Sequence, residues 1–131
     1  MISTKGRYAV RIMLDIAQHS DGEYVPMKEV AERQQLSLKY IERIVPELKE
    51  YGLVDTVHGR GGGYRLTRKP SEYTLWEILS IIEGDLAPVA CLKSDAASCN
   101  RASFCKTLPV WKNYYKMTRE YFGGITLADL M

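Results

Sequence analysis

The order of elements between residues 25 and 67 constrains the fold of this chain more than any other feature. Apolar residues at helical spacing predict a helix over 25–34, and a second helix follows a short break at 35–37, with Ser37 as its N-cap. An alternating β-branched strand, a glycine-rich basic loop at 58–63 and a second short strand come directly after. Two successive helices are common, but this complete order is typical of a winged helix-turn-helix domain.

Further helices are predicted on both sides of this unit. Apolar positions recur at helical spacing over 4–18, and Thr74 is placed to cap a helix over 75–83. Pro46 removes a backbone donor inside the second helix of the unit, so we expect a kink there. The expected fold class is mainly α with a small β-hairpin: a winged helix-turn-helix DNA-binding domain at residues 1–83 plus a long C-terminal dimerisation helix.

The C-terminal part of the chain begins with a stretch that shows no helical or strand period. Residues 84–106 contain all three cysteines, and we assign them as a sensor loop because structureless stretches of this length are usually functional or disordered. We assign residues 107–131 as a dimerisation helix and C-terminal segment. Mostly aromatic side chains recur there at three- and four-residue steps: Trp111, Tyr114, Tyr115, Thr118, Tyr121 and Phe122. A small monomer does not easily cover such a stripe, although packing within one copy is the alternative.

Positive charge is concentrated in the hairpin. The formal net charge is only +2, yet residues 58–69 contain four basic residues and no acidic one. Glycines at 59 and 61–63 would allow left-handed torsions and a close approach to a DNA duplex, with Arg68 and Lys69 available for phosphate. A solvated charge run is the alternative interpretation.

The exposed N-terminal half of the second helix is the expected reader of the major groove. Lys39 and Arg43 can donate to phosphate or guanine, and Tyr40 can bond a phosphate. Glu42 only accepts hydrogen bonds, which favours a cytosine amino group and makes it a candidate specificity residue. Arg60 suits the minor groove of A·T-rich DNA. The expected DNA contacts are Ser37, Lys39, Tyr40, Glu42, Arg43, His58, Arg60, Gly61, Gly62 and Arg65.

Cysteine usage indicates a reduced, metal-, cluster- or redox-related site. The odd number of clustered thiols and the lack of a signal peptide argue against a disulfide framework, so we expect a cytoplasmic protein. No membrane span is expected, because no run approaches the roughly 20 apolar residues that one needs. A zinc site would usually show a closer cysteine pair. A cysteine enzyme would need a nearby base, and the histidines, His19 and His58, are distant in sequence.

Four segments together resemble the iron–sulfur cluster regulators of the IscR, NsrR and CymR type, the Rrf2 family. They are Ser3–Val10, Gly59–Tyr64, the clustered cysteines and Ile125–Leu130. The resemblance covers essentially the whole chain. It implies a homodimeric winged-helix transcription regulator without enzymatic activity, expected here to act as a repressor on a double-stranded DNA operator.

The same resemblance implies that Cys91, Cys99 and Cys105 hold an iron–sulfur cluster, with [2Fe–2S] favoured over [4Fe–4S]. The spacing between Cys91 and Cys99 is longer than is common in the family. Leu108 stands where IscR-type regulators carry a histidine ligand, so the fourth ligand is unknown, and His58 stands where the wing commonly has an arginine. Three alternatives stay open: a cluster-free regulator of the same fold that senses thiol or cysteine status, a zinc site at the cysteines, and a winged-helix module that binds protein.

Overall fold

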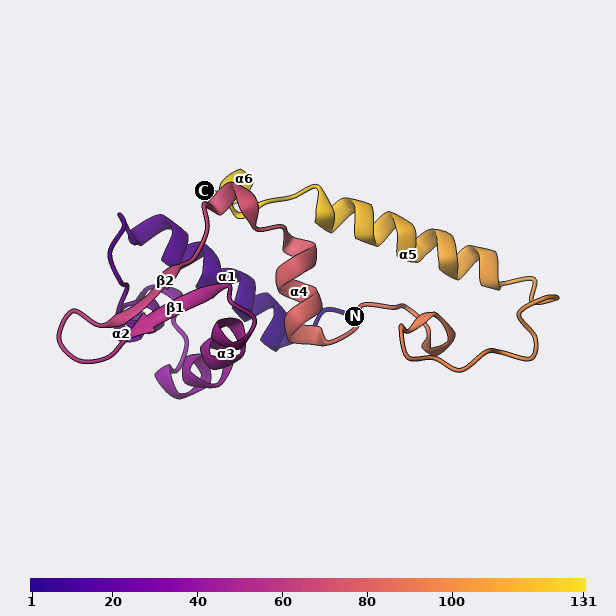
Figure 1. The fold of residues 1–131 in the computed structure, drawn as a ribbon, viewed down its shortest axis with the longest axis horizontal. Coiled ribbons are helices and arrows are strands. Elements are labelled where there is room, and N and C mark those ends of the chain that lie inside the picture. The colour runs from indigo at the N-terminus through magenta and orange to yellow at the C-terminus, as the bar shows by residue number, and fades with distance from the viewer.

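The computed structural model describes residues 1–131 and consists of a packed body and a projecting arm (Figure 1). The body contains α1 (Thr4–His19), α2 (Met27–Gln34), α3 (Leu38–Glu50), β1 (Val54–Val57), β2 (Gly63–Leu66), the 3₁₀ helix η1 (Pro70–Glu72) and α4 (Leu75–Glu83). The arm contains the 3₁₀ helix η2 (Ala90–Leu92) and α5 (Leu108–Gly123), after which α6 (Leu127–Leu130) returns to the body. The structure therefore confirms the expected class, mainly helical with a two-stranded antiparallel hairpin and a C-terminal helix.

Side-chain caps set the helix starts near the expected places. The Ser37 hydroxyl accepts a hydrogen bond from the Tyr40 amide at 3.1 Å, and Thr74 caps α4 in the same way through the Glu77 amide, also at 3.1 Å. The helix α3 continues past Pro46 to Glu50 as a single element, so Pro46 does not begin a separate helical segment. The kink expected at Pro46 stays a prediction.

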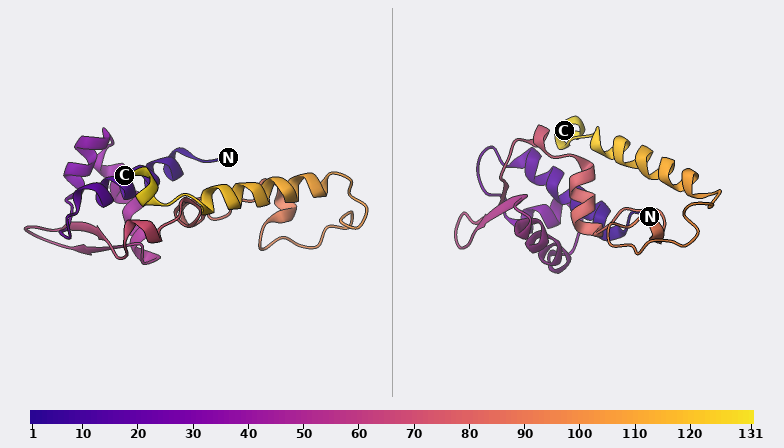
Figure 2. Two further views of the ribbon diagram at one scale, coloured as in Figure 1. Left: turned by 90° about the horizontal axis from the view of Figure 1, so that it is seen from above. Right: turned by 45° about the vertical axis from the view of Figure 1, so that its right-hand side comes forward.

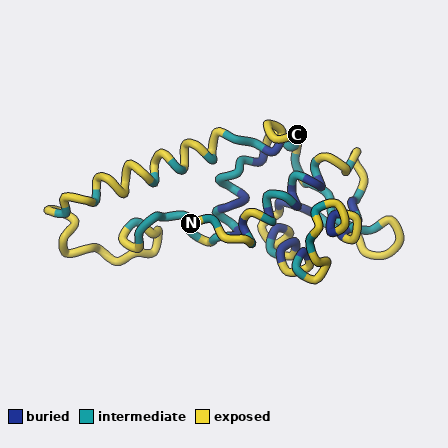
Figure 3. The backbone as a smooth tube through the Cα atoms, turned by 180° about the vertical axis from the view of Figure 1, so that it is seen from behind, coloured by how far each residue is buried: buried dark blue, intermediate teal, exposed yellow.

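One apolar core holds the body together. Its fully buried side chains come from α1 to α4, the segments flanking the hairpin and α6, and include Ile12, Met13, Ile16, Val30, Ile41, Ile44, Leu48, Tyr73 and Ile78. Every buried residue of the chain except Leu127 precedes residue 84 (Figure 3). Leu127 holds α6 against the body in two ways: its side chain is buried in the core, and its amide donates a hydrogen bond to the Tyr73 carbonyl at 3.0 Å. The core thus lies almost wholly in the body, with Leu127 of α6 as the one later contribution, whereas α5 contributes no buried residue.

An ion pair with one buried partner, which no local sequence pattern predicts, fixes α2 against α1. Asp15 is fully buried, and its carboxylate accepts hydrogen bonds from Arg33 Nη2 at 2.7 Å, Arg33 Nε at 3.1 Å and Gln34 Nε2 at 2.8 Å. These three donors satisfy the carboxylate and offset the cost of burying its charge. The pair therefore sets how the helix-turn-helix unit sits on α1.

The start of α1 is tied to the end of α4. The Ser3 hydroxyl caps α1 by accepting from the Gly6 amide at 3.1 Å, and it donates to Glu83 Oε1 at 2.7 Å. A Cβ atom on Gly6 would lie only 2.1 Å from Glu83 Oε1. Glycine at this position thus lets the Glu83 carboxylate reach the helix start.

The arm projects away from the body, as both views of Figure 2 show. At its root, the Asp85 carboxylate accepts hydrogen bonds from the Ala87 amide at 2.8 Å and the Ser94 amide at 3.2 Å. The hairpin loop and the cysteine segment lie at opposite ends of the molecule (Figure 1). None of the helices has both the length and the apolar character needed to cross a bilayer.

Candidate nucleic-acid interface and thiol hollow

The N-terminal half of α3 presents polar side chains outward and apolar ones inward. Lys39, Glu42 and Arg43 are exposed, as is the cap residue Ser37. Ile41, Ile44 and Val45 on the other side of the helix are buried in the core. The amphipathic period of the sequence therefore places these polar side chains on one accessible face.

Tyr40 differs from its neighbours, because it is half-buried. Its ring contacts the Tyr8 ring edge to face, with a centroid distance of 5.5 Å, and the Arg11 guanidinium lies 5.2 Å from the Tyr8 centroid. Tyr40 thus has a packing role between α3 and α1, in addition to the phosphate contact that the sequence predicts.

The hairpin is held in front of α2 by a short bridge to the segment before that helix. The Tyr64 amide donates to the Val25 carbonyl at 2.9 Å, and the Val25 amide donates to the Tyr64 carbonyl at 2.8 Å. Gly63 has a φ of 147°, and a Cβ atom there would lie 2.1 Å from the Val25 oxygen. A Cβ atom on Gly62 would lie 2.4 Å from the Val57 oxygen. These two glycines are therefore required by contacts within the protein, a reason that the sequence analysis missed.

A hollow of about 400 Å³ lies between the hairpin, α3 and the start of α2. Glu42, His58 and Gly62, all expected DNA contacts, line it together with Lys28 at the start of α2. No sequence pattern indicates a role for Lys28, because its place beside the hairpin depends on the bridge at Val25. The hollow joins the helix and the wing into one surface, which we call the recognition surface: residues 37–43 and 58–65.

The basic residues of this region divide into paired and unpaired groups. Lys39, Arg43 and Arg60 take part in no ion pair within the chain. Arg65 forms an ion pair with Asp55, with Nε 3.2 Å from Oδ1, and its guanidinium lies 4.5 Å from the Tyr24 ring centroid. Arg65 therefore has internal partners that DNA would have to compete with.

Arg68, which the sequence analysis considered as a phosphate contact, instead interacts with residues of the protein itself. Its Nη2 lies 2.6 Å from Glu77 Oε1, and its guanidinium lies 4.3 Å from the Tyr73 ring centroid. The hydrogen bond to Glu77 raises the pKa of Arg68 above its ordinary value. Arg68 thus ties the end of the hairpin to α4.

At the other end of the molecule, three thiols surround one hollow of about 300 Å³, which we call the thiol hollow. Cys91 and Cys99 are exposed and Cys105 is half-buried. Lys93, Lys112 and Leu108 also line it. No three His, Cys, Asp or Glu side chains of the chain are close enough together to hold a metal ion. The fold brings the three cysteines to a common space without drawing them into a finished metal site.

Cys105 lies three residues before the start of α5, and polar groups surround its thiol. The Thr107 hydroxyl, 3.5 Å from Sγ, holds the pKa of the Cys105 thiol below its ordinary value. The backbone N–H groups of Thr107 and Leu108 act in the same direction, as does the charge of Arg101. The thiolate, which is both the nucleophile and the metal ligand, is favoured at this position.

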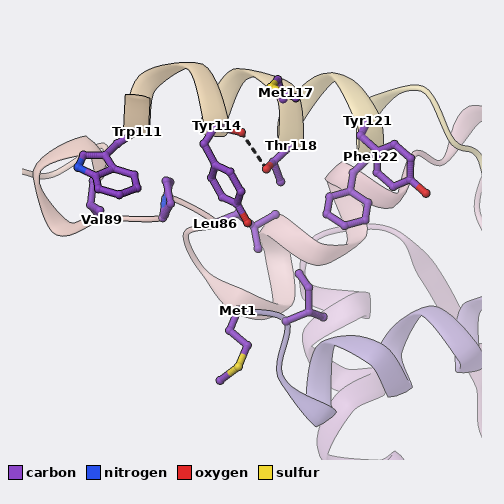
Figure 4. A pocket seen from close by; sticks show the side chains of 11 residues that line it. Met1, Leu86, Val89, Trp111, Tyr114, Met117, Thr118, Tyr121 and Phe122 are labelled. Carbon is purple, nitrogen blue, oxygen red and sulfur yellow. Dashed lines mark hydrogen bonds between the residues drawn. The ribbon is translucent and has the colours of Figure 1, made fainter. Parts of the chain in front are cut away.

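The aromatic stripe of α5 borders an open apolar hollow of about 840 Å³. Trp111 and Tyr114 point from α5 toward the segment that contains Leu86 and Val89 (Figure 4), and Phe122 lines the same hollow. Tyr114 is nevertheless 59% exposed, and Met117 and Tyr121 are exposed to a similar degree. Packing within one copy therefore leaves most of this face uncovered.

Comparison with known proteins agrees with this arrangement. The family model described as "Rrf2: Iron-dependent Transcriptional regulator" matches residues 2–131. The HTH-type transcriptional regulator IscR of Aliivibrio salmonicida (strain LFI1238) is 35% identical over 130 residues, which are 99% of this chain and 76% of that protein.

Solved structures show the same similarity over nearly the full length. CymR (YrzC), the global cysteine regulator of B. subtilis, matches with a TM-score of 0.81 at 32% identity, over 99% of this chain and 95% of that one. T. potens IscR matches with a TM-score of 0.78 at 35% identity, over 99% of this chain and 85% of that one. The chain therefore belongs to the Rrf2 family of DNA-binding transcriptional regulators, which are not enzymes.

Proposed function

We propose that this regulator is a homodimeric repressor whose affinity for its operator is controlled by an iron–sulfur cluster bound at Cys91, Cys99 and Cys105. The observation that carries the proposal is the thiol hollow: three cysteines separated along the chain line one space. The DNA contacts proposed are those of the recognition surface, where unpaired cations lie beside a hydrogen-bond acceptor, Glu42. Phosphate contacts would position the protein, and Glu42 would contribute base specificity.

The apolar face of α5 supports the dimer. A second copy of the same face is its best-matched occupant, because a two-fold axis places identical apolar stripes against each other. The dimer would present two recognition helices to one side of a duplex, as a two-fold symmetric operator requires. The arm boundaries expected from the sequence, residues 84–106 for the sensor loop and 107–131 for the dimerisation segment, are part of this proposal.

The chemistry of the donor set supports a cluster, since cysteine thiolates are its usual protein ligands. The bound cluster, with [2Fe–2S] favoured, would supply a redox-active centre. No side chain that lines the thiol hollow is a usual fourth ligand, because Leu108 is apolar, Lys93 and Lys112 are cationic, and the Ser98 hydroxyl is not a usual cluster ligand.

The three cysteines are well placed to influence α5. Cys105 lies three residues before the start of α5, and Cys91 follows the segment whose Leu86 and Val89 face the α5 stripe. Ligation would have to draw Cys91 and Cys99 toward Cys105, which would move that segment relative to the apolar face. The state of the thiols could thereby alter how two bodies are held, and so how their recognition surfaces fit DNA.

A second candidate function is a regulator without a cluster that responds to thiol chemistry. The lowered pKa of Cys105 favours it, because a larger thiolate fraction raises reactivity toward oxidants. The similarity to a structure named a global cysteine regulator supports it as well.

Anaerobic purification with iron and sulfide analysis and an absorption spectrum tests the choice. We expect visible absorption, iron and sulfide in the wild-type protein and their loss in Cys91→Ser, Cys99→Ser and Cys105→Ser. Ser98→Ala, at another position that lines the thiol hollow, is the matched control and should keep all three signals. Protein that lacks iron and sulfide even after reconstitution would contradict the cluster. Oxidant-dependent operator binding by that protein would then favour the second candidate.

A further inference from the structure

Leu38 is a large apolar residue that is exposed on the surface instead of buried in the core. It is the first residue of α3 and is 38% exposed, although most other exposed large apolar side chains lie in the arm or near the chain ends. Leu36 and Tyr40, two residues before and after it, are partly buried and pack against the core, whereas Leu38 is not among the residues that do so. Its side chain is therefore available on a surface that is otherwise polar.

The position of Leu38 relates it directly to Glu42. Both residues line the hollow between α3 and the hairpin, and they are four residues apart, so they lie one above the other on the same face of the helix. Val57, at the end of β1, is 43% exposed and lines the same hollow. An apolar spot thus lies one helical turn from an acceptor, on the side of α3 that faces the hairpin.

We propose that Leu38 is a specificity residue that contacts the C5-methyl group of a thymine close to the base pair read by Glu42. In the major groove, that methyl group is the one apolar feature that distinguishes the four base pairs. Four residues of α-helix advance about 6 Å and successive base pairs are about 3.4 Å apart, so the two contacts fall one or two base pairs from each other. This inference rests on the proposed use of the recognition surface.

The first step of the test is to obtain a DNA site and then remove methyl groups one at a time. Selection from a pool of random duplexes yields the preferred site of the wild-type protein. Each thymine of one half-site is then replaced by uracil, which differs only in lacking the methyl group. We expect one thymine at which the replacement weakens binding about four-fold, the equivalent of one buried methyl group, and little change elsewhere.

Variants identify the side chain that senses this methyl group. Leu38→Ala should bind more weakly and lose its response to uracil at that thymine, while Leu38→Met should keep most of the response. Lys39→Ala is the control: it should weaken binding but leave the four-fold methyl response intact. Circular dichroism checks that each variant folds.

Two kinds of failure can be told apart. If no duplex is enriched, the proposed use of the recognition surface fails. If a site is enriched but its uracil scan is flat, or Leu38→Ala keeps the wild-type response, the assignment of Leu38 is wrong while DNA binding stands.

Discussion

The body and the arm of this protein use similar apolar residues in opposite ways. The body buries its apolar side chains in a core built from α1 to α4, whereas α5 leaves Tyr114, Met117 and Tyr121 mostly exposed. The body therefore has a core within one chain, while one chain covers the apolar face of α5 only in part, mainly where Tyr115 packs on Trp76 of α4. In the proposed function, a second copy covers the rest of this face and a bound group fills the thiol hollow.

The largest expected effect tests the independence of the body. Arg33→Met removes the main partner of the buried Asp15 carboxylate and should destabilise the body by at most about 3–5 kcal/mol, because the buried charge loses its main counterion and keeps only the Gln34 hydrogen bond and the nearby His19 ring. Urea unfolding measures the loss, which should not depend on protein concentration. The double variant Asp15→Leu/Arg33→Met should recover part of the stability, since it removes both charges.

Glu29→Gln is the control for that pair. The Glu29 carboxylate is exposed and lies 3.6 Å from Arg33, so its loss should cost less than about 1 kcal/mol. Equal effects of Arg33→Met and Glu29→Gln would show that burial of Asp15 does not matter.

The next prediction concerns the arm alone. Tyr114→Glu places a charge in the apolar face of α5 and should weaken dimerisation by about 2–4 kcal/mol, the range of an interface hot spot. Sedimentation equilibrium should show a monomer that keeps the melting temperature of the body. Lys116→Gln, at an exposed position bordering a different hollow of α5, should remain dimeric. A monomeric wild-type protein would refute the proposed dimer.

Within the body, Glu42 and Arg60 should affect DNA recognition differently. Glu42→Ala should relax discrimination at one base pair by about 1–3 kcal/mol, because it removes an acceptor for cytosine. Arg60→Ala should weaken binding chiefly at A·T-rich flanks, where a narrow minor groove attracts arginine. Competition with mutated duplexes measures both effects. A uniform loss of affinity from both substitutions would contradict these roles.

The smallest effect concerns the root of the arm. The Ala87 and Ser94 amides hold the pKa of Asp85 below its ordinary value of 3.8, with the Ala87 hydrogen bond contributing most. The turn that Asp85 stabilises should therefore persist above pH 3.8 and loosen only as the pH falls through the lowered pKa. NMR titration should show the Ala87 and Ser94 amide signals moving together below pH 3.8, with the melting temperature of the body unaffected by Asp85→Asn. A transition above that pH would be inconsistent with the hydrogen bonds.

The sequence predicted most of the body because its signals are local. Ser37 and Thr74 cap helices through bonds to amides three residues away, and the alternation before the glycine loop indicates a hairpin without knowledge of the rest of the fold. The Asp15–Arg33 pair and the Arg68–Glu77 pair were missed, since each depends on how separate elements pack. The requirement for glycine at position 63 could not be predicted either, because it comes from the nearby Val25 carbonyl, which is distant in the sequence.

In the candidate sites too, local features could be predicted from the sequence and long-range ones could not. Helical period predicted that Lys39, Glu42 and Arg43 would share an exposed face, but the closeness of Glu42 to His58 required the folded hairpin. The sequence placed three cysteines in one segment, and only the fold shows that they line a common hollow together with Lys93 and Lys112. Long-range packing therefore decides what each site can bind.

The salt dependence of DNA binding tests the central claim, that α3 and the hairpin form one DNA-facing surface. The triple variant Lys39→Ala/Arg43→Ala/Arg60→Ala is compared with Lys116→Gln in the arm, with affinities measured over a range of salt concentrations. Our account predicts a steep wild-type slope of log K against log salt, which Lys116→Gln should keep. The slope of the triple variant should be shallower by about 0.9 for each phosphate that the protein no longer neutralises. A triple variant with wild-type affinity and slope would contradict the claim.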